Sequence, residues 1–486
     1  METEKPSLLP HINKDIVKGI RGFKLDAYLI ALEGWRRGLT LKWYKDQSPL
    51  CEIHTFRGST HDKCFSLESI ERKHFFYRSR GDKVDNRTVN ICQSKYKTNT
   101  IIKKQGISTP EDDVFNLNGA NAVNIKTFAE KVGFPVIIKP LSGSMGRGVY
   151  TDIKNQEELE KCLEDYMSRY KYKKVIVQKH YFGEEYRVYV VGDRVVGATN
   201  RVPANVVGDG VNNVAQLIDL KNTERKKNPY LASKPIKIDY EVHQLLKNVG
   251  YDLDSIPKKD EIVMLRKKSN LSSGGDPIDA TNELSPEIKR LAVDTLKALP
   301  NIPHAGVDII VNPEEKDRGV VLEVNATAEI AFHMFPLRGN SRDLPKAIID
   351  YYFPETKNIK RNLLYFDYIS ILEPLKTWAV EELKVIDNSQ TLFYGKKYVI
   401  SGKVRNVGYM NWIKRQALKN DFHGYVKKIK NNKLEVAVFG PNKERIEEFK
   451  KTCYKGSKNS EVKHVDEKTL YPNNKLSLKL GFETLL

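Results

Sequence analysis

The chain has 486 residues, with 81 Lys+Arg against 62 Asp+Glu and a formal net charge of +19. This length predicts about three domains, and a content of 40% hydrophobic and 9% aromatic residues excludes disorder over most of the chain. Apolar runs such as 307–311 are strand-sized, so no membrane-spanning helix is expected. The first residues lack the basic-then-apolar order of a signal peptide. We therefore expect a soluble, cytoplasmic protein.

The predicted elements divide the chain into four parts. The first, 1–93, combines short strands with a helix over 25–37 that Gly38 ends. The second, 94–354, alternates strand-like and helix-like segments. The third, 355–395, is a connector in which the apolar spacing of Leu363, Leu364, Ile369 and Leu372 predicts helix. The last part, 396–486, is expected to contain a strand over 398–404, a helix over 411–419, a hairpin over 425–439, a helix over 442–451 and a final strand.

The five cysteines are scattered and odd in number, so no disulfide framework is implied. Cys51, His54, His61 and Cys64 form two pairs of soft ligands of the kind that zinc sites use. The six residues between the pairs make a short gap for such a site. Two half-buried strands around a turn are the favoured alternative, and metal binding here stays open.

Positive charge gathers toward the end of the chain, where residues 391–486 carry 21 Lys+Arg and 9 Asp+Glu, a net of +12. Such a region can meet nucleic acid, an anionic surface or anionic substrates. It has neither the aromatic signature of an RNA-binding module nor zinc-finger spacing. A lysine-rich solvated surface is therefore favoured, nucleic acid is disfavoured, and an acidic peptide or protein partner stays open.

A glycine-rich loop follows the predicted strand 136–138 and its Lys139-Pro140 end. The loop, 142–148, lets backbone N–H groups approach phosphate oxygens, and Lys139 and Arg147 add positive charge. It leads into a second strand over 149–153 and has neither Walker nor dinucleotide-binding spacing. A phosphate-binding loop and a purely structural hairpin both fit this pattern.

Two further strands, 305–311 and 319–325, are predicted to form a hairpin that carries oxygen ligands. Glu323 and Asn325 share one strand face, and Leu322 and Val324 are expected to pack on the other. Antiparallel pairing brings Asp308 near Glu323, to within one residue of register. Magnesium prefers such hard oxygen ligands and keeps positions for phosphates. A salt-bridge pair is the alternative, but neither strand contains a Lys or Arg.

Two polar segments complete the candidate site. The segment 175–187 is an apolar strand, a turn and a second strand, which could enclose a nucleotide base while Glu185 accepts hydrogen bonds from a ribose. The segment 265–275 supplies cations, the amide of Asn270 and a tight turn. Such donors stabilise charge that develops on a carboxylate during phosphorylation.

With these motifs the chain resembles ATP-grasp ligases over 94–354, in particular the ATP-grasp part of cyanophycin synthetase and of bifunctional glutathione synthetase. The resemblance implies an ATP-grasp fold, in which two α+β subdomains grip ATP, and a ligase that joins a carboxylate to an amine through an acylphosphate. The motifs are Ile138-Lys139-Pro140 with Gly146-Arg147-Gly148, Glu185-Tyr186-Arg187-Val188, Arg201-Val202-Pro203-Ala204, Val207-Gly208-Asp209-Gly210, Asn270 to Gly275, Ala305-Gly306-Val307-Asp308 and Glu323-Val324-Asn325-Ala326.

The resemblance also implies a role for each matching residue. ATP would be bound by the phosphate lysines Lys95 and Lys139, the phosphate lid Ser142, Gly143, Ser144, Gly146, Arg147 and Gly148, the adenine hinge Gln178, Lys179, His180 and Tyr181, and the ribose contact Glu185. Asp308, Glu323 and Asn325 would hold two Mg²⁺ ions, with Mn²⁺ as a substitute. Arg266 and Asn270 would stabilise the acylphosphate, and Arg187 and Arg201 would face the same end.

The stretch after the metal ligands departs from the family pattern. Relatives usually continue Ala-Ala-Pro-Gly-Leu-Arg-Met-His, whereas 326–333 here keeps only His333 and has Ala331 at the Arg position. This stretch lies near the acceptor substrate in the family, so the acceptor cannot be carried over. The partner halves of the two named enzymes are also absent, so synthesis of glutathione or cyanophycin is disfavoured.

The last part of the chain resembles acylphosphatase, a βαββαβ domain of ferredoxin-like topology. The resemblance rests on 402–410 and 424–428. Active acylphosphatases have an Arg at the position of Met410 and an Asn at that of Lys428. Loss of the phosphate-binding Arg removes the main charge stabilisation, so a catalytically degenerate domain for docking or regulation is expected.

The leading interpretation is an ATP- and Mg²⁺-dependent carboxylate–amine ligase acting on amino acids or short peptides. The expected architecture is mixed α/β and α+β, with an N-terminal domain that contributes to substrate recognition, the ATP-grasp domain, the connector and the acylphosphatase-like domain. Two alternatives stay open: a ligase acting on a protein or peptide that the basic C-terminal domain docks, and a non-enzymatic ATP-binding regulator. The oligomeric state is left open.

Overall fold

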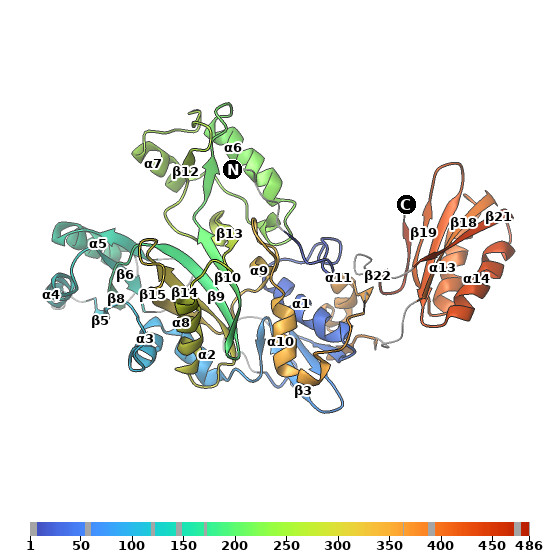
Figure 1. Cartoon of the computed structure of the whole chain (residues 1–486), viewed down its shortest axis with the longest axis horizontal. Helices are drawn as coiled ribbons and strands as arrows, with labels where there is room; N and C mark the ends of the chain where they lie inside the picture. Colours follow the sequence, from blue (N-terminus) through green and yellow to red (C-terminus); the bar gives the residue numbers. More distant parts are fainter. Residues whose placement is uncertain are drawn as a thin grey trace.

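The computed structural model describes residues 7–53, 60–117, 122–141, 148–169, 173–362, 364–386, 394–470 and 478–485. The described elements form three five-stranded sheets, one four-stranded sheet and two short strand pairs. The C-terminal domain lies at one end of an elongated molecule and the four-stranded sheet at the other, with the central sheet and the N-terminal segments between them (Figure 1). No helix within the described ranges is both long and apolar enough to cross a bilayer.

A five-stranded antiparallel sheet forms the centre of the molecule, with the strand order β13-β10-β9-β14-β15. Along β9, Val188 and Val190 pack under helix α8, whereas Arg187 and Tyr189 point to the opposite face. This alternation gives the sheet one apolar face and one face that carries charge. The elements are β9 (Glu184–Val191), β10 (Arg194–Val202), β13 (Asp276–Asp279), β14 (His304–Val311), β15 (Gly319–Asn325) and α8 (Pro286–Lys297).

A four-stranded sheet, in the order β5-β8-β6-β7, lies beside the central sheet (Figure 1). Its helices bury Ile125, Leu159 and Leu163 against the strands. Strands β6 and β7 pair antiparallel, which confirms the predicted strand–loop–strand arrangement around 142–148. The elements are α3 (Lys95–Lys103), which leads into the sheet, β5 (Asp112–Asn116), α4 (Ala122–Val132), β6 (Val136–Pro140), β7 (Tyr150–Ile153), α5 (Gln156–Arg169) and β8 (Lys174–Lys179).

The chain crosses from one sheet to the other in the short turn between β8 and β9. Gly183 in this turn has φ +153, and a Cβ placed on it would lie 2.3 Å from the carbonyl oxygen of Val311. A glycine is therefore required where the turn passes over β14. This turn, called the hinge below, joins the two strands predicted over 175–187 and links the two sheets that flank the candidate site.

A small lobe follows β10 and returns to β13. Its core consists of Val206, Ile218, Leu246 and Leu265, and the buried Arg225 pairs with Asp276 at 2.8 Å. The lobe stands above the central sheet in Figure 1. Its elements are β11 (Asn205–Val207), α6 (Val214–Arg225), the 3-10 turn Leu231–Ser233, α7 (Tyr240–Asn248), β12 (Ile262–Met264) and the 3-10 turn Leu271–Ser273.

The N-terminal domain is completed by segments from much later in the sequence. Helix α1 (Phe23–Arg36) confirms the predicted N-terminal helix, and it packs against α10 (Leu344–Tyr352). The sheet order is β17-β1-β2-β3-β4, so a strand of the connector forms its edge. The strands are β1 (Thr40–Tyr44), β2 (Cys64–Glu68), β3 (Lys73–Tyr77), β4 (Arg80–Gly81) and β17 (Glu382–Lys384), followed by α2 (Asn86–Gln93).

The connector is less helical than its apolar spacing predicts. Leu364 lies in strand β16 (Leu364–Tyr365), and only the short helices α11 (Tyr368–Ile371) and α12 (Glu373–Lys376) follow. Leu363 lies outside the described residues. Pro374 prevents one continuous helix because it lacks a backbone donor and restricts the preceding residue.

The C-terminal domain has the predicted βαββαβ order, with an additional edge strand, β23. Strand β22 pairs in parallel with β16, and Lys479 pairs with Asp367 at 2.9 Å, which joins this domain to the connector. The elements are β18 (Tyr394–Lys403), α13 (Tyr409–Lys419), β19 (His423–Lys428), β20 (Leu434–Gly440), α14 (Lys443–Lys455), β21 (Glu461–Leu470), β22 (Leu478–Lys479) and β23 (Phe482–Leu485).

Replacement of the hinge glycine tests the close approach of the two backbones. Gly183→Ala is expected to destabilise the protein by about 3 kcal/mol, because the methyl group meets a backbone oxygen that cannot move freely. Gly106→Ala is the matched control, since Gly106 has φ +77 but no neighbour within 4 Å of a Cβ, and it should cost only about 1 kcal/mol. Thermal unfolding of both variants measures the difference, and equal shifts in Tm would contradict this account of the hinge.

Candidate active site

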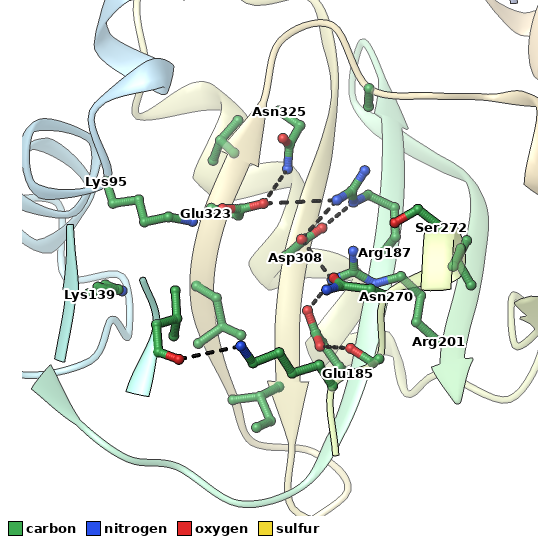
Figure 2. Close-up of a pocket in the computed structure, with 18 of the residues that line it drawn as sticks. Lys95, Lys139, Glu185, Arg187, Arg201, Asn270, Ser272, Asp308, Glu323 and Asn325 are labelled. Carbon is green, nitrogen blue, oxygen red and sulfur yellow. Dashed lines mark hydrogen bonds and ion pairs between the residues drawn. The ribbon is translucent and has the colours of Figure 1, made fainter. Parts of the chain in front are cut away.

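An open cleft of about 1370 Å³ lies between the two sheets. One wall is the charged face of the central sheet, and the opposite wall comes from β6, β8 and the turn after β8. The N-terminal domain closes one end with Phe23 and Arg78. Figure 2 shows the polar side chains that converge on the cleft from these elements: Lys95, Lys139, Glu185, Arg187, Arg201, Asn270, Ser272, Asp308, Glu323 and Asn325.

Strand register sets three charged residues in one row across the central sheet. Asp308 on β14 is the direct partner of Glu323 on β15 and also of Arg187 on β9. The first pairing confirms the register predicted from the sequence. Because directly opposed side chains lie on the same face of a sheet, the row presents two carboxylates and a guanidinium to the cleft.

Asp308 is buried, with 2% of its surface exposed, and its charge is compensated by two guanidinium groups. Arg187 holds it with two hydrogen bonds, the Nη2 bond measuring 2.9 Å, and Arg201 Nη2 donates at 2.8 Å. Burial raises the pKa of the Asp308 carboxyl and the charges of Arg187 and Arg201 oppose this, while the Asp308 carboxylate outweighs burial at Arg187 and raises the pKa of that arginine. The arginines come from β9 and β10 rather than from the hairpin itself, which is why the hairpin sequence showed no partner.

Glu323 is compensated from a different direction. Lys95, at the start of α3, forms an ion pair with its Oε2, and Arg187 Nη2 lies 4.0 Å from its Oε1. Burial disfavours the carboxylate, but these two cations outweigh it and hold the pKa of Glu323 well below its usual range. Asn325 Nδ2 donates to Glu323 Oε1 at 3.1 Å, so the amide oxygen of Asn325 remains for another partner.

The donor set of Asp308, Glu323 and Asn325 fits a hard divalent cation. It offers two carboxylates and one amide oxygen on neighbouring strands, and these are the ligand types that Mg²⁺ prefers. The cations that hold these carboxylates come from other elements, so they could be exchanged for a metal ion without breaking the hairpin. The residues therefore fit Mg²⁺.

The predicted alternation along β15 is wrong at Leu322. The register slips by one residue between the Asp308–Glu323 pair and the Ile309–Val321 pair, which leaves Leu322 as a bulge. Val321 and Val324 consequently enter the core, and Leu322 lines the cleft. A bulge adds one residue to one strand and re-aims its neighbours, and it directs Glu323 toward the cleft.

Lys139 projects from β6 on the opposite wall. It is buried and donates a hydrogen bond to Gln178 of β8, and no ion pair accompanies it among the described residues. Burial, together with the nearby charge of Lys95, lowers the pKa of Lys139 to about 7. An anion that enters the cleft would raise the pKa of this buried amine and so favour its protonated form.

The predicted hinge residues Gln178, Lys179, His180 and Tyr181 all line the cleft. Gln178 is buried, and its side-chain oxygen accepts the hydrogen bond from Lys139. Lys179 Nζ donates to the carbonyl oxygens of Gly133 at 2.8 Å and Phe134 at 3.2 Å. These bonds position the side chain of Lys179 against the loop before β6. Of the predicted phosphate lid, Ser142, Gly143, Ser144, Gly146 and Arg147 lie outside the described residues, and Gly148 follows them with φ +68.

Glu185 lies at the cleft end of β9, where it accepts hydrogen bonds from Arg201 and from Ser269. Asn270 also lines the cleft, as predicted, together with Lys267 and Lys268.

Arg266 differs from the other predicted residues in its position. It does not line the cleft; its guanidinium pairs with Asp239 and Glu241, each at 2.5 Å. These carboxylates belong to the start of α7, and tertiary packing brings them to Arg266 across the small lobe.

Five residues at the far end of the cleft were not predicted. Tyr230 and Lys234 come from the lobe, Phe23 and Arg78 from the N-terminal domain, and Glu329 from the stretch that departs from the family pattern. The departure of residues 326–333 from the family pattern was the one feature of the sequence that pointed to this end of the cleft. The other four carry no motif, because their proximity arises only from the packing of separate parts of the chain.

The possible zinc ligands do not form a cluster in the described part of the chain. Cys51 and Cys64 are buried, His61 pairs with Asp62 at 3.3 Å, and His54 lies outside the described residues. The group close enough to share an ion within the described ranges is His11, Glu33 and Asp343.

That group is occupied by a guanidinium. Arg361 donates to both Glu33 and Asp343 at 2.6 Å, so its carboxylates already have a cation.

Two regions of this chain are similar to known proteins. Residues 92–226 match the family model of the RimK-like ATP-grasp domain, and residues 396–483 match that of acylphosphatase. Cyanophycin synthetase of Nostoc sp. is 34% identical over 278 residues, which cover 56% of this chain and 30% of that protein. The glutathione biosynthesis bifunctional protein GshAB of Pasteurella multocida is 35% identical over 277 residues, which cover 54% of this chain and 36% of the relative.

Among solved structures, a bifunctional glutathione synthetase from Pasteurella multocida is 30% identical, with a TM-score of 0.47 over 60% of this chain and 40% of that chain. The chain thus spans about a third of the length of the curated relatives it matches. The resemblance predicted from the sequence is confirmed: the chain contains an ATP-grasp region related to these ligases and a C-terminal acylphosphatase-like domain.

Proposed function

We propose that this protein is an ATP- and Mg²⁺-dependent ligase that joins the carboxylate of one amino acid or short peptide to the amine of another. The row of Glu323, Asp308 and Arg187 facing Lys139 across the cleft carries the proposal. The relatives of this chain include a cyanophycin synthetase and a glutathione biosynthesis protein, which supports the proposal.

The reaction consists of two steps, phosphorylation of the carboxylate and attack by the amine. An oxygen of the substrate carboxylate attacks the γ-phosphorus of ATP, the bond to the β,γ-bridging oxygen breaks, and ADP leaves with that electron pair. The amine nitrogen of the second substrate then attacks the acyl carbon, loses a proton, and expels inorganic phosphate. The product is an amide.

The first step must overcome repulsion between a triphosphate and a carboxylate. Lys95 and Lys139 would bind the phosphates, and Arg201 and Asn270 would stabilise the charge on the acyl phosphate. Asp308, Glu323 and Asn325 would hold Mg²⁺, which supplies charge neutralisation and orientation of the phosphates when bound.

The ion pairs of the cleft fit an exchange of partners on nucleotide binding. Lys95 now neutralises Glu323, and Arg187 and Arg201 neutralise Asp308. If a cation takes over both carboxylates, Lys95 becomes free for a phosphate and the arginines for the reacting carboxylate. Each buried charge keeps a partner throughout, which avoids the cost of an isolated buried ion.

A first prediction concerns the metal ligands. We expect ADP and phosphate release with MgATP in at least one pool of amino acids or dipeptides, and a loss of at least about 100-fold for Asp308→Asn combined with Glu323→Gln. The paired control is Asp294→Asn with Glu315→Gln, two exposed carboxylates outside the cleft, and it should keep full activity. Release that survives in the first variant would contradict the assigned ligands.

A second prediction concerns Lys139. Because its pKa is about 7 in the free protein, the amine is charged below this pH and neutral above it, so phosphate binding at higher pH requires proton uptake. The apparent Kd of MgATP should therefore rise above pH 7, approaching tenfold per pH unit.

Calorimetry from pH 6.5 to 9 in buffers of different ionisation enthalpy measures both the affinity and the proton uptake. Lys139→Arg should remove most of the pH dependence, because arginine stays protonated, while Lys103→Arg should leave it unchanged. A flat pH profile in the wild type would refute the role of Lys139.

A third prediction concerns the C-terminal domain. Met410 is partly buried against the domain core, Lys428 is exposed, and Arg405 donates to Asn432 at 2.8 Å rather than standing free. We therefore expect hydrolysis of benzoyl phosphate only at the background rate. Met410→Arg with Lys428→Asn should raise it at least about 10-fold, whereas Lys428→Asn alone should not. Hydrolysis by the wild type, abolished by Arg405→Ala, would show that the domain is active.

A further inference from the structure

Arg78 is a cation from the N-terminal domain that reaches the cleft. It follows β3 in a tight turn, with φ +59, and its guanidinium carbon lies 3.1 Å from the ring centroid of Phe23, which also lines the cleft. Its Nη2 donates to the carbonyl oxygen of Thr327 at 3.2 Å. The stacking and the hydrogen bond fix the guanidinium at the end of the cleft that the N-terminal domain closes.

Arg78 differs from the other charged residues of this wall because it has no carboxylate partner. Among the described residues no acidic oxygen pairs with it, and its Nε is buried without a hydrogen-bond partner. In contrast, Glu329 is held by the Tyr230 hydroxyl at 2.8 Å and lies 3.5 Å from Lys234 Nζ. The Asp26 and Glu329 carboxylates act on Arg78 through their charge without bonding it, so its partly buried guanidinium still lacks a bonded anion, which fits an anionic ligand in the cleft.

The nearest acidic group behind the wall does not fill this place. Asp26 is buried, and its Oδ1 accepts hydrogen bonds from the backbone N–H groups of Ile330 and Ala331, each at 3.0 Å. Burial, reinforced by the charge of Glu329, raises the pKa of Asp26 to about 7. At neutral pH this group therefore offsets the charge of Arg78 only in part.

The position of Arg78 separates it from the phosphorylation centre. Thr327, which it contacts, lies in the turn after β15, whereas Asp308, Glu323 and Asn325 lie within β14 and β15. A carboxylate bound at Arg78 would therefore be held from the N-terminal domain, whereas the carboxylate to be phosphorylated would lie beside the metal ligands on β14 and β15.

We propose that Arg78 binds a second, free carboxylate of the substrates, one that is not activated by ATP. The planar guanidinium matches a carboxylate with parallel hydrogen bonds, and its stacking on Phe23 holds that plane in place. The substrate class is accordingly an amino acid or peptide with a free carboxylate in addition to the reacting group. This inference rests on the proposed ligase function and adds a specificity residue from outside the ATP-grasp region.

The test compares free acids with their carboxamides. ADP release is measured with MgATP for the amino acids and dipeptides that support it, and for the same compounds with the non-reacting carboxylate converted to an amide. The wild type should prefer the acid by roughly 10- to 100-fold in kcat/KM. Arg78→Gln should lose this preference through a higher KM for the acid, with Arg78→Lys intermediate.

Arg72→Gln is the matched control, because Arg72 lies in the same sheet region but pairs with Glu71 at 2.8 Å and is outside the cleft. It should retain the preference, and all variants should keep wild-type Kd for MgATP and wild-type Tm. Equal use of acid and amide by the wild type, or an unchanged preference in Arg78→Gln, would overturn the role of Arg78 while leaving the ligase intact. Absence of release in every pool would instead reject the proposed function and this inference with it.

Discussion

The buried carboxylate of Asp308, held between Arg187 and Arg201, is the interaction on which the site depends. A charge this deeply buried is tolerated only if its partners are fixed in place. Here they are fixed by backbone register, since β14 pairs with β9 along its whole length and β9 pairs with β10. The bulge at Leu322 then turns Glu323 to the same face. The strand pairing of one sheet therefore sets the positions of two carboxylates and two guanidinium groups, and no loop is needed to place them.

The opposite wall is constructed differently. Lys139 comes from a separate sheet whose link to the first is the turn at Gly183, where two backbones approach too closely for a side chain. A cleft between two rigid sheets that share a short hinge can change its width without disturbing either core. The carboxylates of the central sheet already pair with Lys95, Arg187 and Arg201, so closure on an anionic ligand can exchange ion-pair partners instead of burying new unpaired charge.

The third boundary of the cleft belongs to the N-terminal domain. Its sheet is completed by β17 from the connector, and α1 packs against α10. Asp26 of α1 bonds the backbone at Ile330 and Ala331, directly after the strand that carries Glu323. The domain is thus anchored at the point where the sequence leaves the family pattern. Residues of the N-terminal domain and of this stretch therefore line the same cleft.

The sequence alone determined the local elements: α1, the β14–β15 hairpin, the strand–loop–strand around the glycines, the βαββαβ order of the last domain, and the candidate ligands Asp308, Glu323 and Asn325. These follow from short-range periodicity and motif spacing, which a linear sequence contains. Only the tertiary structure decided that β9 and β10 supply the partners of Asp308, that Arg266 pairs within the lobe, that the connector joins the N-terminal sheet, and that Arg78 reaches the cleft. Sheet order, bulges and domain packing are set by contacts between residues far apart in the chain, and no local pattern encodes them.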